Sequence, residues 1–216
     1  MDIMRFRKLP VLGILRGVGE DAIPPLVEAM LAAGLETLEI AMNSKDAAAA
    51  IRRAKESAGS RLTVGAGTVL DPELLKIALD AGASFIVTPV LVPEVAEYCS
   101  KNIIPFFPGA LTPQEIYNAW HAGATMVKVF PAGALGPGYL REVKGPFNNV
   151  ELLACGGVTA DNVRSYFDNG ANAVAFGASI FRKEWIEKRD FRSIKESIKK
   201  LLEQVTNCPR CRSDAG

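Results

Sequence analysis

Short apolar segments alternate with longer amphipathic segments along almost the whole chain, up to about residue 205. The apolar residues of the short segments follow one another almost without interruption, which is typical of strands in a parallel sheet covered on both faces. We expect eight such strands, at residues 10–16, 35–42, 61–69, 84–90, 103–108, 124–131, 150–157 and 172–179. Eight strands separated by helical segments predict an α/β fold of the (β/α)8 TIM-barrel type.

The segments between the strands carry apolar residues at helical spacing. Helices are expected at residues 20–34, 45–59, 71–82, 112–123 and 159–170. The pattern also predicts a short leading helix within residues 1–9 and a last helix within residues 180–205. Residues 1–205 are therefore expected to form a single barrel domain. Residues 206–216 carry no pattern, and we expect a mobile tail there.

A weak internal repeat supports the barrel. Four corners between a helix and a strand share a glycine, at Gly34, Gly82, Gly123 and Gly170. Each glycine stands where the end of a helix needs a left-handed residue. The four corners precede the second, fourth, sixth and eighth strands, so the repeat is two strand–helix units long, as a quarter of a barrel would be.

Composition and charge exclude several classes of protein. The chain has 216 residues, of which 49% are hydrophobic and 23% charged, as in ordinary globular proteins. A net charge of +1 provides no basic field for a nucleic acid or an acidic membrane, so neither is an expected partner. The chain shows no secretory signal and no membrane-length apolar run. The four cysteines do not form a disulfide framework, so we expect a cytoplasmic protein.

The chain is also poor in metal ligands. Its single histidine, His121, argues against metal-dependent hydrolases and aldolases, which usually need several imidazoles. His121 just precedes a helix end, where a cation interacts favourably with the helix dipole. Cys208 and Cys211 have metal or redox spacing, but the chain offers no second pair to complete a zinc site. We expect no metal site and no resident cofactor.

Three charged residues fall late in predicted strands, at the end of the barrel where active sites of this fold lie: Arg16, Glu39 and Lys128. Side chains alternate between the two faces of a strand. Leu38 and Ile40 suit the helix layer, which directs Glu39 into the barrel. The same alternation directs Lys128 inward, on the face shared with Met126 and Phe130.

Two interpretations of these charges remain open. Glu39 can form a buried salt bridge with Lys128 or Arg16, because converging buried charges are costly unless they pair. Alternatively they carry chemistry. Desolvation between Val127 and Val129 favours a neutral amine on Lys128, which can attack a carbonyl and form an imine. An imine is an electron sink for breaking an adjacent C–C bond, and Glu39 is the carboxylate placed to move protons.

Glycine-rich turns follow the last two strands. Gly156 and Gly157 end the seventh, and Gly177 and Ser179 end the eighth. This is the usual phosphate-binding position of the fold, although glycines also serve simply in tight turns. Thr68 ends the third strand as a neutral donor near the barrel mouth. Its hydroxyl can instead cap the helix that starts near residue 71.

At this point the chain resembles the KHG/KDPG aldolases, from about Leu9 to residue 190. The matching motifs are ILRG (14–17), LEIAMNS (38–44), VGAGTVL (64–70), VTP (87–89), PFFPGALTP (105–113), VKVFPA (127–132), GPGYLREVKGPF (136–147), CGGVT (155–159) and FGAS (176–179). The resemblance implies a Schiff-base, metal-independent aldolase that cleaves 2-keto-3-deoxy-6-phosphogluconate or 4-hydroxy-2-oxoglutarate to pyruvate and an aldehyde. It also implies a homotrimer.

The resemblance assigns roles to individual residues. Lys128 forms the imine and Glu39 handles protons. Thr68 helps to hold the pyruvate carboxylate. Many members place the partner arginine four residues after the glutamate, where this chain has Asn43. Arg16 in ILRG, a placement that other members share, is therefore the expected carboxylate ligand.

Further residues are expected to contact substrate. By resemblance, Gly156, Gly157 and Ser179 hold the phosphate. Pro89 of VTP and Phe130 of VKVFPA are further candidate substrate contacts.

The residue before the paired glycines is the second departure from the family pattern. Gluconate-type members usually have threonine there and galactonate-type members valine, whereas this chain has Cys155. The stereochemistry of the substrate therefore stays open, and a 2-keto-3-deoxy-6-phosphogalactonate aldolase is the alternative function. We expect this position to influence sugar stereochemistry, so Cys155 is a further candidate substrate contact. A small residue that fills the barrel is favoured over a reactive thiol.

Two rival functions remain. One is a phosphate-binding barrel enzyme that forms no imine, such as an isomerase or a thiamin-phosphate-synthase-like transferase. The other is a silent barrel that binds sugar phosphates without turnover. The combination of Lys128, Glu39 and Arg16 argues against the silent barrel. The enzyme without an imine stays open, and treatment with a keto acid and borohydride would leave it unmodified.

Overall fold

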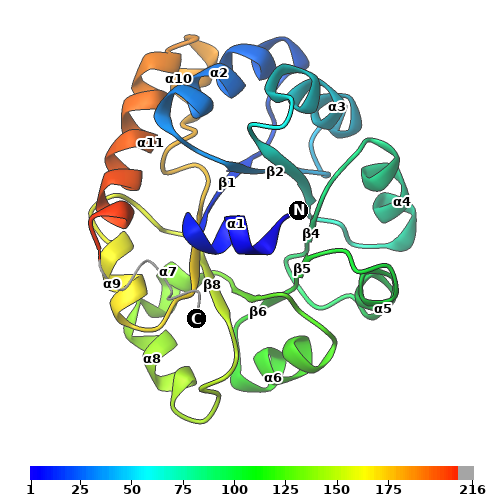
Figure 1. Ribbon diagram of the computed structural model, residues 1–216, viewed down its shortest axis with the longest axis vertical. Coiled ribbons are helices and arrows are strands. Elements are labelled where there is room, and N and C mark those ends of the chain that lie inside the picture. Colours follow the sequence, from blue (N-terminus) through cyan, green and yellow to red (C-terminus); the bar gives the residue numbers. More distant parts are fainter. Residues whose placement is uncertain (209–216) are drawn as a thin grey trace.

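The computed structural model describes residues 1–208, and its strands form a parallel barrel surrounded by helices (Figure 1). The strands are β1 (Val11–Leu15), β2 (Thr37–Ala41), β3 (Thr63–Gly67), β4 (Ile86–Val87), β5 (Phe106–Phe107), β6 (Gly109–Ala110), β7 (Val127–Val129), β8 (Leu152–Cys155) and β9 (Ala173–Phe176). Their order in the sheet is β5-β4-β3-β2-β1-β9-β8-β7-β6. The predicted α/β barrel is confirmed.

The fifth barrel strand is present in two halves. Pro108 separates β5 from β6, because proline donates no backbone hydrogen bond to a ladder. β5 pairs with β4, and β6 pairs with β7. Two further bonds run from this strand to the next, Thr125 N to the Phe106 carbonyl and Lys128 N to the Pro108 carbonyl, both at 2.8 Å. These bonds close the barrel beside Lys128.

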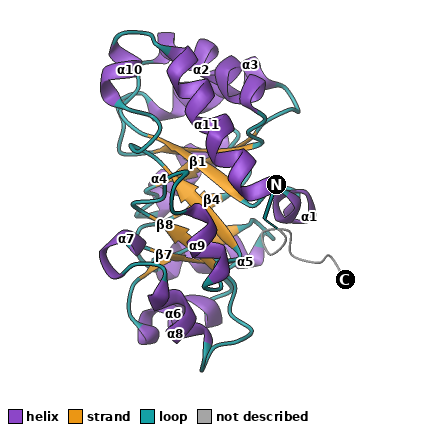
Figure 2. Ribbon diagram, turned by 90° about the vertical axis from the view of Figure 1, so that its left-hand side faces the viewer, coloured by secondary structure: helices purple, strands orange, loops and turns teal. Residues whose placement is uncertain are grey.

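The helices form the outer layer, as Figure 2 shows from the side. They are α1 (Ile3–Lys8), α2 (Ile23–Ala33), α3 (Ala47–Ala58), α4 (Pro72–Asp80), α5 (Pro93–Lys101), α6 (Pro113–His121), α7 (Ala132–Leu135), α8 (Gly138–Lys144), α9 (Val163–Asp168), α10 (Lys183–Glu187) and α11 (Phe191–Thr206), with a 3-10 turn at Glu20–Ala22. No helix within residues 1–208 is long and apolar enough to cross a membrane.

The four corner glycines behave as predicted. Gly34, Gly82, Gly123 and Gly170 have φ angles of 91°, 94°, 90° and 95°, which lie in the left-handed region. Each one therefore ends a helix and turns the chain into the next strand.

The last helix predicted within residues 180–205 is present as α11, and the shorter α10 precedes it. Arg189 adopts a left-handed backbone (φ 55°) and separates α10 from α11. Asp190 then caps α11 by accepting a hydrogen bond from the backbone of Ser193 at 3.1 Å. α11 ends at Thr206, inside the segment expected to be a tail, and Cys208 is buried. The remainder of that predicted tail lies outside the described residues.

Strand phase divides the core into two layers. Leu38, Ile40, Val127 and Val129 pack in the larger cluster between sheet and helices. A smaller cluster fills the barrel interior and consists of Phe6, Leu12, Phe85, Val87, Phe107, Met126, Leu153, Cys155, Ala173 and Ala175. The predicted alternation along the second and sixth predicted strands is thus confirmed.

Helix α1 lies across one end of the barrel (Figure 1). Its Phe6 is buried against Phe107 with ring centroids 6.0 Å apart, and Phe107 in turn contacts Phe85 at 5.8 Å. This aromatic stack fills the end at which the strands begin. The opposite end, where the strands finish, is left for the site.

Candidate active site

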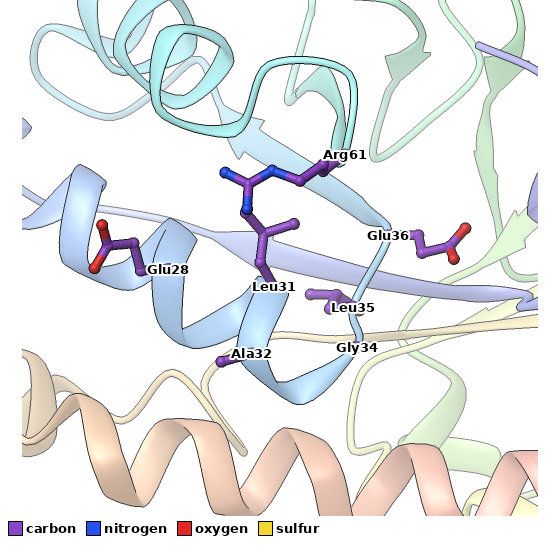
Figure 3. A pocket seen from close by; sticks show the side chains of 7 residues that line it. All are labelled: Glu28, Leu31, Ala32, Gly34, Leu35, Glu36 and Arg61. Carbon is purple, nitrogen blue, oxygen red and sulfur yellow. The ribbon is translucent and has the colours of Figure 1, made fainter.

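One hollow of the described surface lies away from the predicted site. It measures about 510 Å³ and lies where α2 ends and β2 and β3 begin (Figure 3). Arg61 extends over Leu31 there, while its guanidinium donates to carbonyls at the end of α3. No predicted site residue lines it. Because active sites of this fold lie at the opposite, carboxyl ends of the strands, this hollow is not the candidate site.

Glu39, in the middle of β2, is fully buried, and neither of its carboxylate oxygens has a hydrogen-bond partner. Burial raises the pKa of this carboxyl above its ordinary value, while the charges of Lys128 and then Arg16 oppose the increase. An unpaired buried carboxylate is costly. Because neither oxygen has a partner, the alternative of a direct salt bridge from Glu39 to Lys128 or Arg16 is wrong.

Lys128, in the middle of β7, is only 6% exposed. Its Nζ lies 5.4 Å from the centre of the Phe130 ring, which is 40% exposed at the barrel mouth. The peptide bond between Phe130 and Pro131 is cis. In the sheet Lys128 pairs with Gly109 on one side and Leu153 on the other. The lysine thus stands on the inner wall beside an aromatic rim.

Cys155, at the end of β8, belongs to the barrel interior. Burial raises the pKa of its thiol to about 11, against the opposing influence of Lys128. The thiol is therefore protonated near neutral pH and is a small, uncharged part of the barrel interior. The charges of Lys128 and Arg16 oppose this increase of the thiol pKa, and the charge of Glu39 adds to it.

Arg16 and Thr68 lie together at the rim. The Arg16 Nη2 donates to the Thr68 Oγ1 at 3.3 Å. Thr68 has a φ of 58°, an unusual conformation for a β-branched residue and a frequent mark of functional sites. The predicted alternative, that Thr68 caps the next helix, is wrong, because Asp71 caps α4 by accepting from Leu74 N at 2.7 Å.

A residue without a predicted role supports this rim. Ser44, in the loop after β2, accepts a hydrogen bond from the backbone of Gly17 at 2.8 Å. This bond ties the loop that follows β2 to the loop that carries Arg16. The motif LEIAMNS contains Ser44, but only the fold brings it to Gly17.

Pro89 and Phe130 face a shared cavity of about 240 Å³. Its lining is mainly apolar and consists of Pro89, Val90, Leu91, Gly109, Ala110, Leu111, Glu115, Asn118 and Phe130. A Cβ on Gly109 would lie 2.0 Å from the Pro89 carbonyl oxygen, so β6 can approach the loop after β4 only with glycine there. These two predicted contacts therefore border one space next to Lys128.

The family model for KDPG and KHG aldolase matches residues 3–197. The chain belongs to this family. It is accordingly an aldolase, which is a carbon–carbon lyase. It is 34% identical to the 2-dehydro-3-deoxy-phosphogluconate aldolase of Pseudomonas aeruginosa, over 92% of this chain and 89% of that one. It is 32% identical to the 2-dehydro-3-deoxy-6-phosphogalactonate aldolase of Escherichia coli K12, over 92% and 97%.

Solved structures agree with this assignment. A native KDPGal structure superposes with a TM-score of 0.86 at 30% identity, covering 92% of this chain and 95% of that one. A Legionella pneumophila KDPG aldolase with pyruvate captured as a covalent carbinolamine gives 0.84 at 27% identity, with coverages of 91% and 95%. Thiamine phosphate pyrophosphorylase from Pyrococcus furiosus, at 15% identity and 0.71, shares the fold alone.

The glycine turn of this aldolase lies beside Cys155. Gly156 and Gly157 have φ angles of 95° and 78°, which glycine adopts without strain. The Gly156 carbonyl accepts from Gly133 N at 2.9 Å. The Gly157 carbonyl accepts from Asn162 Nδ2 at 2.8 Å. Both carbonyls are thus held within the protein.

Asn162 is a second residue that the sequence analysis missed. Its side chain also accepts from Thr159 N at 2.8 Å, so one amide spans the turn. Ser179, in the turn after the neighbouring β9, donates its hydroxyl to the Val158 carbonyl at 2.7 Å. Ser179 therefore joins the two glycine turns, and a phosphate would meet its oxygen as an acceptor unless the hydroxyl rotates.

Metal ligands are sparse in the part of the chain that the structure describes. It contains no group of three or more His, Cys, Asp or Glu side chains that could hold a metal ion. The one histidine, His121, lies in the last turn of α6, with Nδ1 2.9 Å from the Tyr117 carbonyl.

Proposed function

We propose that this aldolase cleaves a 2-keto-3-deoxy-6-phospho sugar acid, with 4-hydroxy-2-oxoglutarate as a second substrate, to pyruvate and an aldehyde. The aldehyde is glyceraldehyde 3-phosphate or glyoxylate, respectively. The observation that carries the proposal is the buried, unpaired carboxylate of Glu39 in the same mouth as Lys128. Such a costly arrangement favours a chemical role over a structural one.

The first step is formation of an imine. Arg16 and Thr68 hold the carboxylate of the 2-keto acid, which suits a guanidinium and a hydroxyl already in contact at the rim. The Lys128 Nζ attacks the C2 carbonyl carbon. The resulting carbinolamine loses water and leaves a protonated imine that withdraws electrons from C3. The carbinolamine in the Legionella pneumophila relative supports this chemistry.

The second step breaks the C3–C4 bond. Glu39, directly or through a water, removes the proton of the C4 hydroxyl as the bonding electrons move into the imine. The aldehyde departs and an enamine remains. Glu39 then helps to return a proton to C3, and water hydrolyses the imine to release pyruvate and free Lys128. A raised pKa at Glu39 suits a group that both accepts and returns a proton.

The phosphate is proposed to lie at the glycine turns formed by Gly156, Gly157 and Ser179. Glycines allow close approach of the backbone to an anion. The carbonyls of both glycines are already engaged within the protein, which favours presentation of N–H groups to an anion. Phe130 and Pro89 border the remaining apolar space at the mouth.

The sugar stereoisomer is left open in this proposal. Relatives named for the gluconate and for the galactonate compound are almost equally similar. Cys155 stands before the glycines as a small, protonated thiol. A 2-keto-3-deoxy-6-phosphogalactonate aldolase is therefore the alternative, and measuring kcat/KM for both phosphosugar acids distinguishes the two.

We also propose that the reaction needs no cofactor, because the imine itself is the electron sink. Activity should then survive exhaustive dialysis against EDTA. We further propose a homotrimer, which the family resemblance supports, and a cytoplasmic location. Light scattering coupled to size exclusion tests the trimer, and cell fractionation tests the location.

Reduction with borohydride tests the proposal directly. Incubation with pyruvate and sodium borohydride should add one pyruvate-derived group to Lys128, measured by intact mass and peptide mapping. Lys144 is a matched internal control, because burial lowers the pKa of this half-buried lysine outside the mouth. An adduct on Lys144 alone, or none in folded protein, would favour a barrel enzyme that forms no imine. An adduct on Lys128 without aldol turnover would favour a silent binding barrel.

A further inference from the structure

Gly67, the last residue of β3, faces the carboxyl of Glu39. A Cβ on Gly67 would lie 1.6 Å from the Glu39 Oε1, 2.3 Å from Cδ and 2.6 Å from Cγ. All three distances are far below van der Waals contact. The Glu39 carboxyl therefore occupies the volume that any side chain at position 67 would need.

The requirement for glycine at position 67 is steric and does not come from the backbone. Gly67 is not among the described glycines with positive φ, so its strand conformation is open to any residue. Gly65, two residues earlier, repeats the pattern with another partner, because its Cβ would lie 2.5 Å from the Phe85 ring. The inner face of β3 thus leaves two spaces, one for an aromatic ring and one for a carboxyl.

We propose that Gly67 is a positioning residue for proton transfer. Because Gly67 has no side chain, it leaves the space in which the Glu39 carboxyl lies. This inference rests on the proposed role of Glu39. β2 and β3 pair in register, with Glu39 opposite Gly65 and Ala41 opposite Gly67. The backbone of β3 is therefore fixed against β2, and a methyl group at position 67 must displace the carboxyl.

The size of the displacement predicts the size of the effect. Ordinary contact with a Cβ begins at 3.4 Å, so the Oε1 would have to move by about 1.8 Å. A misplacement of about 1 Å can slow a reaction about 100-fold. We expect Gly67→Ala to lower the rate of proton transfer about 100-fold, while attack by Lys128 on β7 continues.

Exchange of the pyruvate methyl protons with deuterium measures this step alone. The imine of pyruvate loses a C3 proton to the base and regains a deuteron from the solvent, which proton NMR detects. Gly67→Ala should retain the borohydride-trapped adduct on Lys128, lose exchange about 100-fold and shift the acidic limb of the exchange–pH profile. Gly65→Ala is the matched control, because its methyl group strains the same strand against Phe85. It should keep most of the exchange rate.

Thermal unfolding of a double-mutant cycle tests the contact without relying on catalysis. Gly67→Ala should lower Tm in the native background. In the Glu39→Ala background it should not, because the three clashing atoms are gone. Equal losses of Tm in both backgrounds would overturn the contact. Unchanged exchange in a folded Gly67→Ala enzyme would overturn the positioning role. Absence of an adduct in the native protein would instead refute the proposed function.

Discussion

The two ends of the barrel differ in whether their charged side chains have partners. At the end where strands begin, Arg5 pairs with Glu36 at 2.8 Å and Arg7 pairs with Glu151 at 2.6 Å. At the end where strands finish, the carboxylate oxygens of Glu39 have no hydrogen-bond partner.

The two ends also differ in packing. The first end is closed by α1 and the ring of Phe6. The second carries a left-handed Thr68 and a half-exposed Phe130 ring. One end thus satisfies its polar groups and adds stability, whereas the other leaves polar groups unsatisfied where a substrate would enter.

Replacement of Lys128 should have the largest effect on this contrast. Lys128→Ala removes the nucleophile, and we expect aldol cleavage to fall by about 10⁴-fold or more. Steady-state assays with both phosphosugar acids measure the loss, and Lys144→Ala is the control. Full activity of Lys128→Ala would refute the imine mechanism.

Replacement of Glu39 tests whether its unpaired carboxylate transfers protons. Glu39→Gln should slow turnover about 10²–10⁴-fold, with a smaller effect on substrate binding, because proton transfer is lost while the shape is kept. Separate measurement of kcat and of pyruvate binding checks this. A rise in Kd with an unchanged kcat would assign Glu39 to binding only.

The same variant should also reveal the stability cost through pH. The pKa of Glu39 is raised on folding, so its ionised form destabilises the folded state above that raised pKa, and this loss disappears as pH falls towards its ordinary value of 4.5. Glu39→Gln should therefore be more stable than the native protein at pH 8, with an advantage that shrinks by pH 5. Urea unfolding at both pH values measures the difference. An advantage that grows as pH falls would contradict the sign.

Substitutions at the closed end should lower the free energy of unfolding and leave imine formation unchanged. Phe6→Ala removes a buried ring from the aromatic stack and should lower the free energy of unfolding by about 3–5 kcal/mol. Met4→Ala, at a position 52% exposed on the same helix, is the control. Borohydride trapping on the folded fraction should be unchanged. Loss of the adduct in folded Phe6→Ala would show that the two ends are coupled.

The ion pairs of the closed end should matter least. Arg7→Met leaves the Glu151 carboxylate unpaired at a partly exposed position, and we expect a cost of about 1 kcal/mol or less. Because salt screens such pairs, the cost should shrink further in 1 M NaCl. Chemical unfolding at low and high salt checks both statements. A loss of several kcal/mol would mean that this end also depends on buried charge.

Local patterns predicted much of this molecule, and their failures have physical causes. Strand phase and the corner glycines depend on near-neighbour sterics, so alternation around Glu39 and Lys128 could be inferred correctly. The short helix α10 was not predicted as a separate element, because its boundary with α11 depends on a single left-handed residue, Arg189, and on the cap at Asp190. The split at Pro108 likewise depends on one missing donor within a strand that is otherwise apolar.

The sequence by itself determined the alternation of strands and helices, the inward faces of the strands that carry Glu39 and Lys128, and the set of reactive side chains. These follow from period, turn residues and chemical identity. Only the tertiary structure decided that Glu39 is left without a hydrogen-bond partner, that Asn162 holds the glycine turn, and that the carboxyl fills the space beside Gly67. These properties depend on distances between strands far apart in the chain. Such distances are set by barrel closure and packing, which no local pattern encodes.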